Sequence, residues 1–236
     1  MNFKESAIIM KRELMSYFTT PVAYIVISVF LAATGWFFFS TFFLYGQAEL
    51  RGFFQLLPLM LSFVVPAVTM RLFSEEKNTG SFEMLMTLPV SAENVVLGKL
   101  LGAAVFVAVM LAPTLVYAVS AALSGSLDPG PVAGGYIGAL LLGCAFSGIG
   151  VLASSITKNQ IIAFMAAMTV CLALSLVDKF LFFLPSPVLN VVEYLGADYH
   201  FRNISRGIID SRDILYFLSL IAVSVIAATK VLEERR

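Results

Sequence analysis

Charge is scarce in this sequence, and hydrophobic residues dominate it. Of the 236 residues only 13% are charged and 59% are hydrophobic, with a mean hydropathy of +0.92. Soluble domains carry about 25% charged residues, so most of this surface must face something other than water. Lysine plus arginine equals aspartate plus glutamate, at 15 each, which excludes the basic footprint of a nucleic-acid-binding protein. We therefore predict an all-α protein that crosses a membrane several times.

Histidine and cysteine are too few and too scattered to predict a metal site. Cys144 and Cys171 both lie in apolar runs without ligand spacing, which is typical of structural thiols. His200 is the single histidine, and its neighbours Tyr199 and Phe201 favour a place in the aromatic belt of the membrane interface. The sequence predicts no catalytic residue, no metal and no cofactor held by this chain.

A phosphate-binding loop is also missing. Gly98-Lys99 has the spelling of the end of such a loop, but Glu93 stands where the pattern needs glycine and Leu100 where it needs serine or threonine. The chain is not predicted to hydrolyse ATP by that route.

Residues 2–19 have the pattern of an amphipathic helix. Its apolar residues recur at spacings of three and four, namely Phe3, Ala7, Met10, Leu14 and Phe18. The basic residues Lys4, Lys11 and Arg12 fall on other faces, where they would meet anionic lipid head groups. The alternative is a frayed tail in the cytosol.

Six stretches are long and apolar enough to span a bilayer, whose core of about 30 Å needs roughly 20 helical residues. We place them at about 22–44, 53–70, 99–123, 135–156, 161–184 and 213–231, within a single transmembrane domain over residues 1–236. With the N-terminus inside, ten of the 15 lysines and arginines fall on the cytoplasmic side and five outside. This distribution predicts both termini in the cytoplasm.

Prolines and small residues mark places within the spans. Pro58 and Pro66 in the second span and Pro113 in the third each favour a kink. The pairs Gly134 with Gly138 and Gly143 with Ser147 permit close helix contact. We expect them to serve packing inside the chain rather than a dimer seam.

Residues 71–98 form a polar segment between the second and third spans. We expect Arg71 at head-group level, and Glu75, Glu76 and Lys77 in solvent. Thr79-Gly80-Ser81 breaks the chain, and Ser91 caps the helix that becomes the third span. Between them we predict a short helix capped by Ser81, with Phe82, Leu85 and Met86 on one side, Glu83 on another, and Pro89 at its end. Two interpretations stay open: the helix docks into a groove of a soluble partner, or it rests on the lipid surface.

The connection 185–212 is half apolar but has no long apolar run. We expect one or two short helices that dip into the outer leaflet, where protein or water can satisfy their backbone. The stretch Asp210-Ser211-Arg212-Asp213 then supplies capping side chains for the last span.

The segment RLFSEEKNTGSFEMLMTLPVSAENVVLGK resembles the signature loop of the type-2 ABC transporter permeases, which has an arginine, an acidic pair, Thr-Gly-Thr/Ser, Pro-Val-Ser and Gly-Lys. Three other stretches, KRELMSYFTTPVAYIVISVFL, PAVTMRLFSEEK and FRNISRGIIDSRDILYFLSL, are similar to the gliding-motility-type and nitrous-oxide-reductase-maturation-type permeases. Met84 departs from the common leucine, conservatively.

The resemblance implies a six-helix permease subunit in the bacterial inner membrane, without its own ATPase. It would pair with a second permease copy, identical or related, and with a nucleotide-binding subunit that holds ATP and Mg. An extracytoplasmic or membrane accessory protein is a further implied partner. The implied contacts with the ATPase subunit lie in residues 71–98, at Arg71, Glu75, Glu76, Thr79, Gly80, Ser81, Phe82, Glu83, Leu85, Met86 and Pro89. The implied outer gate includes Arg202, Arg206, Gly207, Asp210, Arg212 and Asp213.

Two functions remain open at this stage. The first is ATP-driven export of a substrate. The second is a non-transporting module that passes ATP-driven shape changes to an outer partner. Polar groups in mid-span are scarce and uncharged, namely Ser62, Thr69, Thr169 and Ser175. A path for a large polar solute normally shows more of them, so their scarcity favours a lipid-like substrate or none.

Overall fold

The computed structural model describes residues 3–45, 49–83, 90–125, 127–179, 193–208 and 210–234. Within these ranges the chain is helical and has no strand, as predicted. The elements are α1 Phe3–Thr19, α2 Pro21–Tyr45, α3 Arg51–Thr69, α4 Arg71–Thr79, α6 Ala92–Leu111, η1 Ala112–Thr114, α7 Leu115–Ser124, α8 Pro129–Ile156, α9 Gln160–Leu176, α11 Ala197–Ser205 and α12 Ser211–Glu233.

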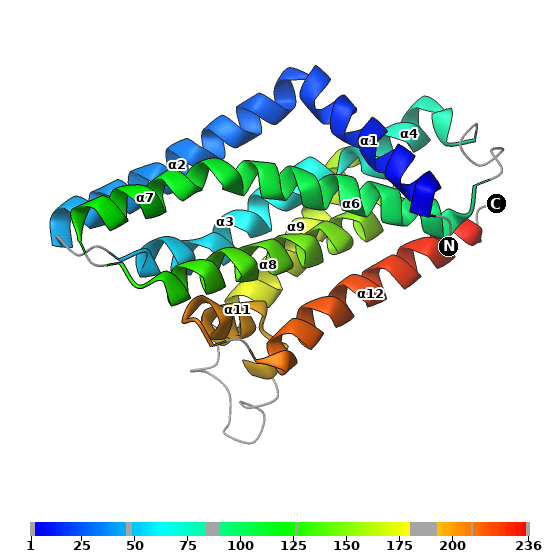
Figure 1. The fold of residues 1–236 in the computed structure, drawn as a ribbon. Coiled ribbons are helices and arrows are strands. Elements are labelled where there is room, and N and C mark those ends of the chain that lie inside the picture. The colour runs from blue at the N-terminus through cyan, green and yellow to red at the C-terminus, as the bar shows by residue number, and fades with distance from the viewer. Residues whose placement is uncertain are drawn as a thin grey trace.

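Six helical stretches of the described chain are long and apolar enough to cross a membrane, which confirms the predicted number. They are Pro21–Ser40, Arg51–Thr79, Ala92–Ser124, Pro129–Ile156, Gln160–Lys179 and Ser211–Glu233. The expected extension of the fifth span to residue 184 lies outside the described residues. Both termini lie at one end of the bundle (Figure 1), which we call the proximal end. We call the opposite end, where α11 lies beside the starts of α8 and α12, the distal end.

Side-chain caps fix where several helices begin. The Ser91 hydroxyl accepts a hydrogen bond from the Asn94 backbone N–H at 3.3 Å, and Asp210 accepts one from the Arg212 N–H at 3.0 Å. Both caps were predicted, and both satisfy N–H groups that the first helical turn leaves unpaired. Asp128 and Asn159 cap α8 and α9 in the same way.

Pro113 interrupts the third span. The α-helix gives way at Ala112 to the short 3-10 turn η1, because proline lacks the N–H that an α-helix needs. Thr114 donates to the Leu111 carbonyl at 2.6 Å within this turn, and α7 then continues the span. Pro58 and Pro66 lie inside α3, which runs on through both.

The bundle is built around α8, whose glycines receive side chains from the surrounding helices. A Cβ at Gly150 would lie 1.9 Å from Thr69 Oγ1, and one at Gly135 would lie 2.3 Å from the Phe54 ring. Small residues let neighbouring helices approach this closely. Gly138, Gly143 and Gly148 meet Phe201, Val107 and Ser224 in the same manner. The expectation that Gly138 and Gly143 pack within the chain is confirmed.

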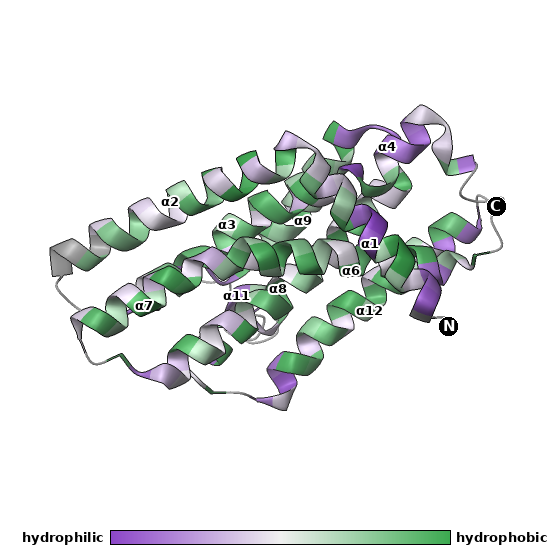
Figure 2. Ribbon diagram, turned by 45° about the horizontal axis from the view of Figure 1, so that its top comes forward, coloured by the Kyte–Doolittle hydropathy of each residue, from purple (hydrophilic) through white to green (hydrophobic). Residues whose placement is uncertain are grey.

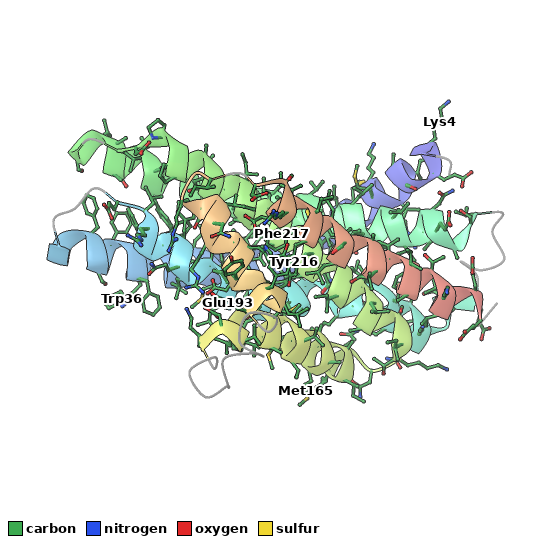
Figure 3. All side chains as sticks on the ribbon, turned by 90° about the horizontal axis from the view of Figure 1, so that it is seen from below. Lys4, Trp36, Met165, Glu193, Tyr216 and Phe217 are labelled. Carbon is green, nitrogen blue, oxygen red and sulfur yellow. The ribbon has the colours of Figure 1, made fainter. Side chains whose placement is uncertain are left out.

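The outward faces of the spans are apolar. Figure 2 shows hydrophobic colouring along their length and hydrophilic colouring at α4, α1 and the last turns of α12. Trp36 of α2 is 74% exposed and Met165 of α9 is 57% exposed, and both project away from the bundle in Figure 3. Apolar surface on this scale suits contact with lipid or protein rather than with water.

Candidate functional site

A buried lysine joins three helices at the proximal end. Lys99 of α6 is 1% exposed. Its Nζ donates to Glu13 Oε1 of α1 at 2.7 Å, to Glu76 Oε1 of α4 at 2.8 Å, and to the Leu72 carbonyl of α4 at 2.7 Å. An ammonium has three donors, and all three are used. We call this group, Glu13, Leu72, Glu76 and Lys99, the Lys99 node.

The Lys99 node is held by its charges. Removing an ammonium from water costs several kcal/mol unless opposite charges and hydrogen bonds compensate it. Here two carboxylates and one carbonyl do so, and Lys99 Nζ also lies 5.0 Å from the centre of the Phe73 ring. Because the partners belong to α1 and α4, the node fixes both helices to the third span.

A second lysine connects α4 to α8. Lys77 is 7% exposed, its Nζ donates to the Ser155 carbonyl in the last turn of α8, and it lies 5.0 Å from the centre of the Phe82 ring. The expectation that Glu76 and Lys77 are solvated is therefore wrong. That expectation assumed that the second span ends at Arg71. In the structure α4 continues the span to Thr79 and packs one of its faces against the bundle.

Arg71 also lies inside this packing rather than simply at a head-group boundary. Its guanidinium stands 4.9 Å above the Tyr17 ring of α1, and the Tyr17 hydroxyl donates to the Val68 carbonyl at 3.2 Å. Burial, with a smaller effect of Glu13, raises the pKa of Tyr17 well above its ordinary value. Tyr17 therefore stays a neutral donor, and it ties α1 to the end of α3.

The predicted break after α4 is present. Gly80 has φ +78°, a left-handed conformation that glycine adopts without strain, and it ends α4. The Ser81 hydroxyl lies 3.0 Å from Thr79 Oγ1 and bonds back to the Glu76 carbonyl at 3.4 Å. Phe82 is buried, while Glu75 and Glu83 are exposed. The predictions for Leu85, Met86 and Pro89 lie outside the described residues.

Helix α1 packs on α6 through two glycines. A Cβ at Gly98 would lie 2.7 Å from Ile9 Cβ, and one at Gly102 would lie 3.1 Å from Glu13 Cβ. Leu14 and Phe18, two of the apolar residues that predicted an amphipathic helix, pack against the core. The exposed face of α1 carries Ile8 and Met15 with the basic residues Lys4, Lys11 and Arg12. Lys4 projects away from the bundle in Figure 3.

At the distal end, two buried aspartates surround one arginine. Asp178 and Asp198 are 5% and 6% exposed in their side chains, and Arg202 contacts both. Lys179 adds a bond of 3.3 Å to Asp198 and one of 3.5 Å to Asp178. Burial raises the pKa of Asp198, and Asp178 raises it further, while Arg202 and Lys179 oppose the shift. The group fixes α11 to the end of α9.

His200 does not belong to an interfacial aromatic belt, contrary to the prediction. It is fully buried, with Nδ1 2.6 Å from Asp213 Oδ1 and Nε2 2.9 Å from the Tyr194 carbonyl, and its ring stacks on Tyr216 at 4.0 Å. The reason is that α11 folds over the start of α12 and turns this face inward. Asp213, predicted as a cap, instead binds His200.

The remaining distal residues have separate places. Gly207, with φ +85°, follows α11, while Arg206 and Arg212 are exposed. Within the described ranges, no three His, Cys, Asp or Glu side chains are grouped to hold a metal ion. Sequence reasoning missed the roles of Glu13, Lys77, Lys99 and Asp178. The sequence does show that these charged residues border or interrupt apolar runs, but that position alone does not identify the residue that each one contacts.

The family model described as ABC-2 family transporter protein matches residues 33–222. No curated protein matches the chain. The matched range contains α3, α4, α6, α8, α9 and α11, and thus Lys99 and Glu76 but not Glu13.

Proposed function

Because the chain belongs to the ABC-2 family of transporter proteins, we propose that it is a permease subunit that couples ATP hydrolysis by a separate nucleotide-binding subunit to export of a substrate across the bacterial inner membrane. ATP and Mg are bound by that partner, and two permease copies form the membrane part. The proximal end, with both termini, faces the cytoplasm. The resemblance to the gliding-motility-type and nitrous-oxide-reductase-maturation-type permeases supports membership in that subgroup, whose accessory partners act outside the membrane.

The observation that carries the coupling proposal is the Lys99 node. It bonds α4, the extension of the second span, to the third span and to α1. A displacement of α4 therefore moves two spans and the surface helix together, because the Lys99 ammonium that joins them is buried and uses all three of its donors. This is the property that a segment receiving force from an ATPase needs.

The surface offered to the ATPase is acidic. Glu75 and Glu83 are exposed on either side of the Gly80 turn, while Phe82 between them is buried. Exposed charges at a rim steer association and set specificity more than they set affinity. We propose that these two carboxylates meet a basic groove on the nucleotide-binding subunit.

A second candidate function has its own support. The mid-span hydroxyls of Thr34, Ser62 and Thr69 donate to carbonyls of their own helices, and Ser175 donates to the Pro58 carbonyl. Hydroxyls used in this way do not line a hydrophilic path through the chain. They favour an apolar cargo, or a module that transmits ATP-driven motion to an outer partner with no cargo at all.

The coupling proposal is tested by reversing the exposed acidic charges. Glu75→Lys with Glu83→Lys is expected to reduce co-purification of the nucleotide-binding subunit at low salt and to reduce its ATPase stimulation. The matched control is Glu233→Lys with Glu234→Lys, which makes the same charge change at exposed residues of the same end. Normal capture and stimulation by the first pair would refute the coupling assignment.

An assay in lipid vesicles distinguishes export of a cargo from transmission of motion to an outer partner. The complex reconstituted with its ATPase is supplied with ATP and a fluorescent lipid-like cargo. Movement of the cargo that depends on ATP supports export. ATP-dependent binding of the outer partner without movement of cargo supports transmission.

A further inference from the structure

A pocket of about 400 Å³ opens at the distal end, where the start of α3, the start of α8 and the end of α11 meet. Arg51, Arg202 and Arg206 are among the residues that line it. Leu50, Phe54 and Val132 contribute apolar surface. The lining of the pocket therefore combines cationic and apolar residues.

The three arginines differ in their partners. Arg202 is bonded to Asp178 and Asp198, so its position is fixed and its charge is largely balanced. Arg51 and Arg206 are exposed, and neither has an ion pair with any residue that the structure describes. Two acidic residues, Glu49 and Asp128, also border the pocket. The Asp128 carboxylate caps α8, where it accepts a hydrogen bond from the Gly130 N–H at 3.0 Å.

The position of Arg206 is set by close backbone contacts between α11 and α8. A Cβ at Gly134 would lie 2.2 Å from the Ile204 carbonyl oxygen, and one at Gly207 would lie 3.2 Å from the Gly130 carbonyl carbon. Gly207 also has φ +85°, which turns the chain directly after Arg206. The segment that carries Arg206 is thus ordered before a ligand binds, so binding does not incur the entropy cost of ordering it.

The apolar part is equally well defined. Phe54 is 3% exposed, and its ring lies against Gly135, where a Cβ would approach to 2.3 Å. Tyr136 meets the same ring edge to face at 5.5 Å. Because α3 and α8 both begin here as apolar spans, the pocket lies at the depth where lipid head groups border the hydrocarbon.

We propose that this pocket binds the phosphate-bearing, net anionic head group of an amphiphile, with Arg51 and Arg206 on the phosphate oxygens and the apolar chain against Phe54. Guanidinium groups match phosphate geometry with paired hydrogen bonds. The adjoining apolar wall distinguishes an amphiphile from inorganic phosphate. The proposal concerns binding alone and does not depend on whether the chain transports cargo.

The test uses the purified full-length chain and a titration with phosphatidylglycerol followed by native mass spectrometry. Arg206→Gln is expected to weaken binding about tenfold, as loss of one charge-assisted pair implies, and Arg51→Gln with Arg206→Gln to weaken it further. The matched control is Arg212→Gln, because Arg212 is an exposed arginine at the same end that does not line the pocket. Phosphatidylcholine is expected to bind more weakly than phosphatidylglycerol to the unchanged protein.

Two results would overturn the proposal. The first is equal phosphatidylglycerol binding by the double variant and the Arg212→Gln control. The second is full competition by millimolar inorganic phosphate, which would assign the site to free phosphate. Gel-filtration profiles of the variants check that the fold is retained, which is expected because Arg51, Arg206 and Arg212 are exposed.

Discussion

Lys99 Nζ lies 2.7 Å from Glu13 Oε1, although the two residues are 86 positions apart in the chain. The bond joins α1 to the third span, and Glu76 completes it from α4. Since one ammonium serves both carboxylates, losing it leaves two half-buried negative charges facing each other. The stability of the proximal end should therefore depend on this one side chain.

Lys99→Met is expected to lower the free energy of unfolding by about 3 to 5 kcal/mol, the usual cost of breaking one partner of a buried ion pair. Thermal unfolding in a mild detergent measures it. Lys158→Met, at an exposed lysine of the same end, should change little. Adding Glu13→Gln and Glu76→Gln to Lys99→Met should recover part of the loss, because no unpaired charge then remains. A Lys99→Met variant as stable as the Lys158→Met control would contradict the node.

Gly150→Ala is expected to destabilise the bundle by about 1 to 3 kcal/mol through overpacking. The added methyl group would overlap Thr69 Oγ1, only 1.9 Å away. Gly130→Ala is the control, since its nearest neighbour, Asp128 Oδ1, is 3.5 Å away. Unfolding temperatures of the two variants should differ clearly. Equal temperatures would mean that α8 and α3 do not approach as closely as the structure has them.

Asp198→Asn should change the pH dependence of stability. Burial raises the pKa of Asp198 above 3.8 in the folded chain, so the folded state holds this proton more tightly than the unfolded state does. The resulting stabilisation is complete below pH 3.8 and disappears as the pH rises through the raised pKa. The unfolding temperature of the variant minus that of the unchanged protein should therefore increase from about pH 3.5 to pH 7. A difference that stays flat or falls contradicts the raised pKa; Glu234→Gln, at an exposed carboxyl, is the control.

His200→Phe is expected to cost about 2 to 3 kcal/mol, because it leaves the buried Asp213 carboxyl without its partner. The pair stands 2.6 Å apart with both side chains almost fully enclosed. The double variant His200→Phe with Asp213→Leu should be more stable than His200→Phe alone, since it removes both polar groups. Thermal unfolding of the two variants checks this, and a double variant less stable than the single one would argue against the pairing.

The spans could be predicted because each is a long interval between charges, and that interval is a local property of the chain. The caps Ser91 and Asp210 were equally local. Lys77 and Lys99 were not, because nothing within a few residues of them shows that they are buried. Their acceptors include Ser155 and Glu13, which are 78 and 86 positions away, and only tertiary packing brings them close. His200 was misplaced for the same reason.

The candidate site likewise has features that the local sequence predicts and features that depend on tertiary packing. The polar character of the segment after Arg71 was evident from its residues, and so was the Gly80 turn. That α4 continues the second span rather than leaving the bundle was not evident, because Ser74 and Lys77 read as polar while their neighbours Leu72 and Phe73 pack inward. The distal pocket depends on residues from three regions between Glu49 and Arg206, which no single motif contains.

Where a helix meets its neighbours through glycine, no side-chain rotamer can absorb a displacement. Helix α8 has six such glycines between Gly134 and Gly150, beside larger buried side chains such as Leu142 and Phe146. Lys77 bonds α4 to the carbonyl of Ser155 in its last turn, and Gly134 in its first turns touches the backbone of α11. The compliance of this connection is therefore low, and a small movement of α4 should reach the opposite face of the membrane with little loss of amplitude.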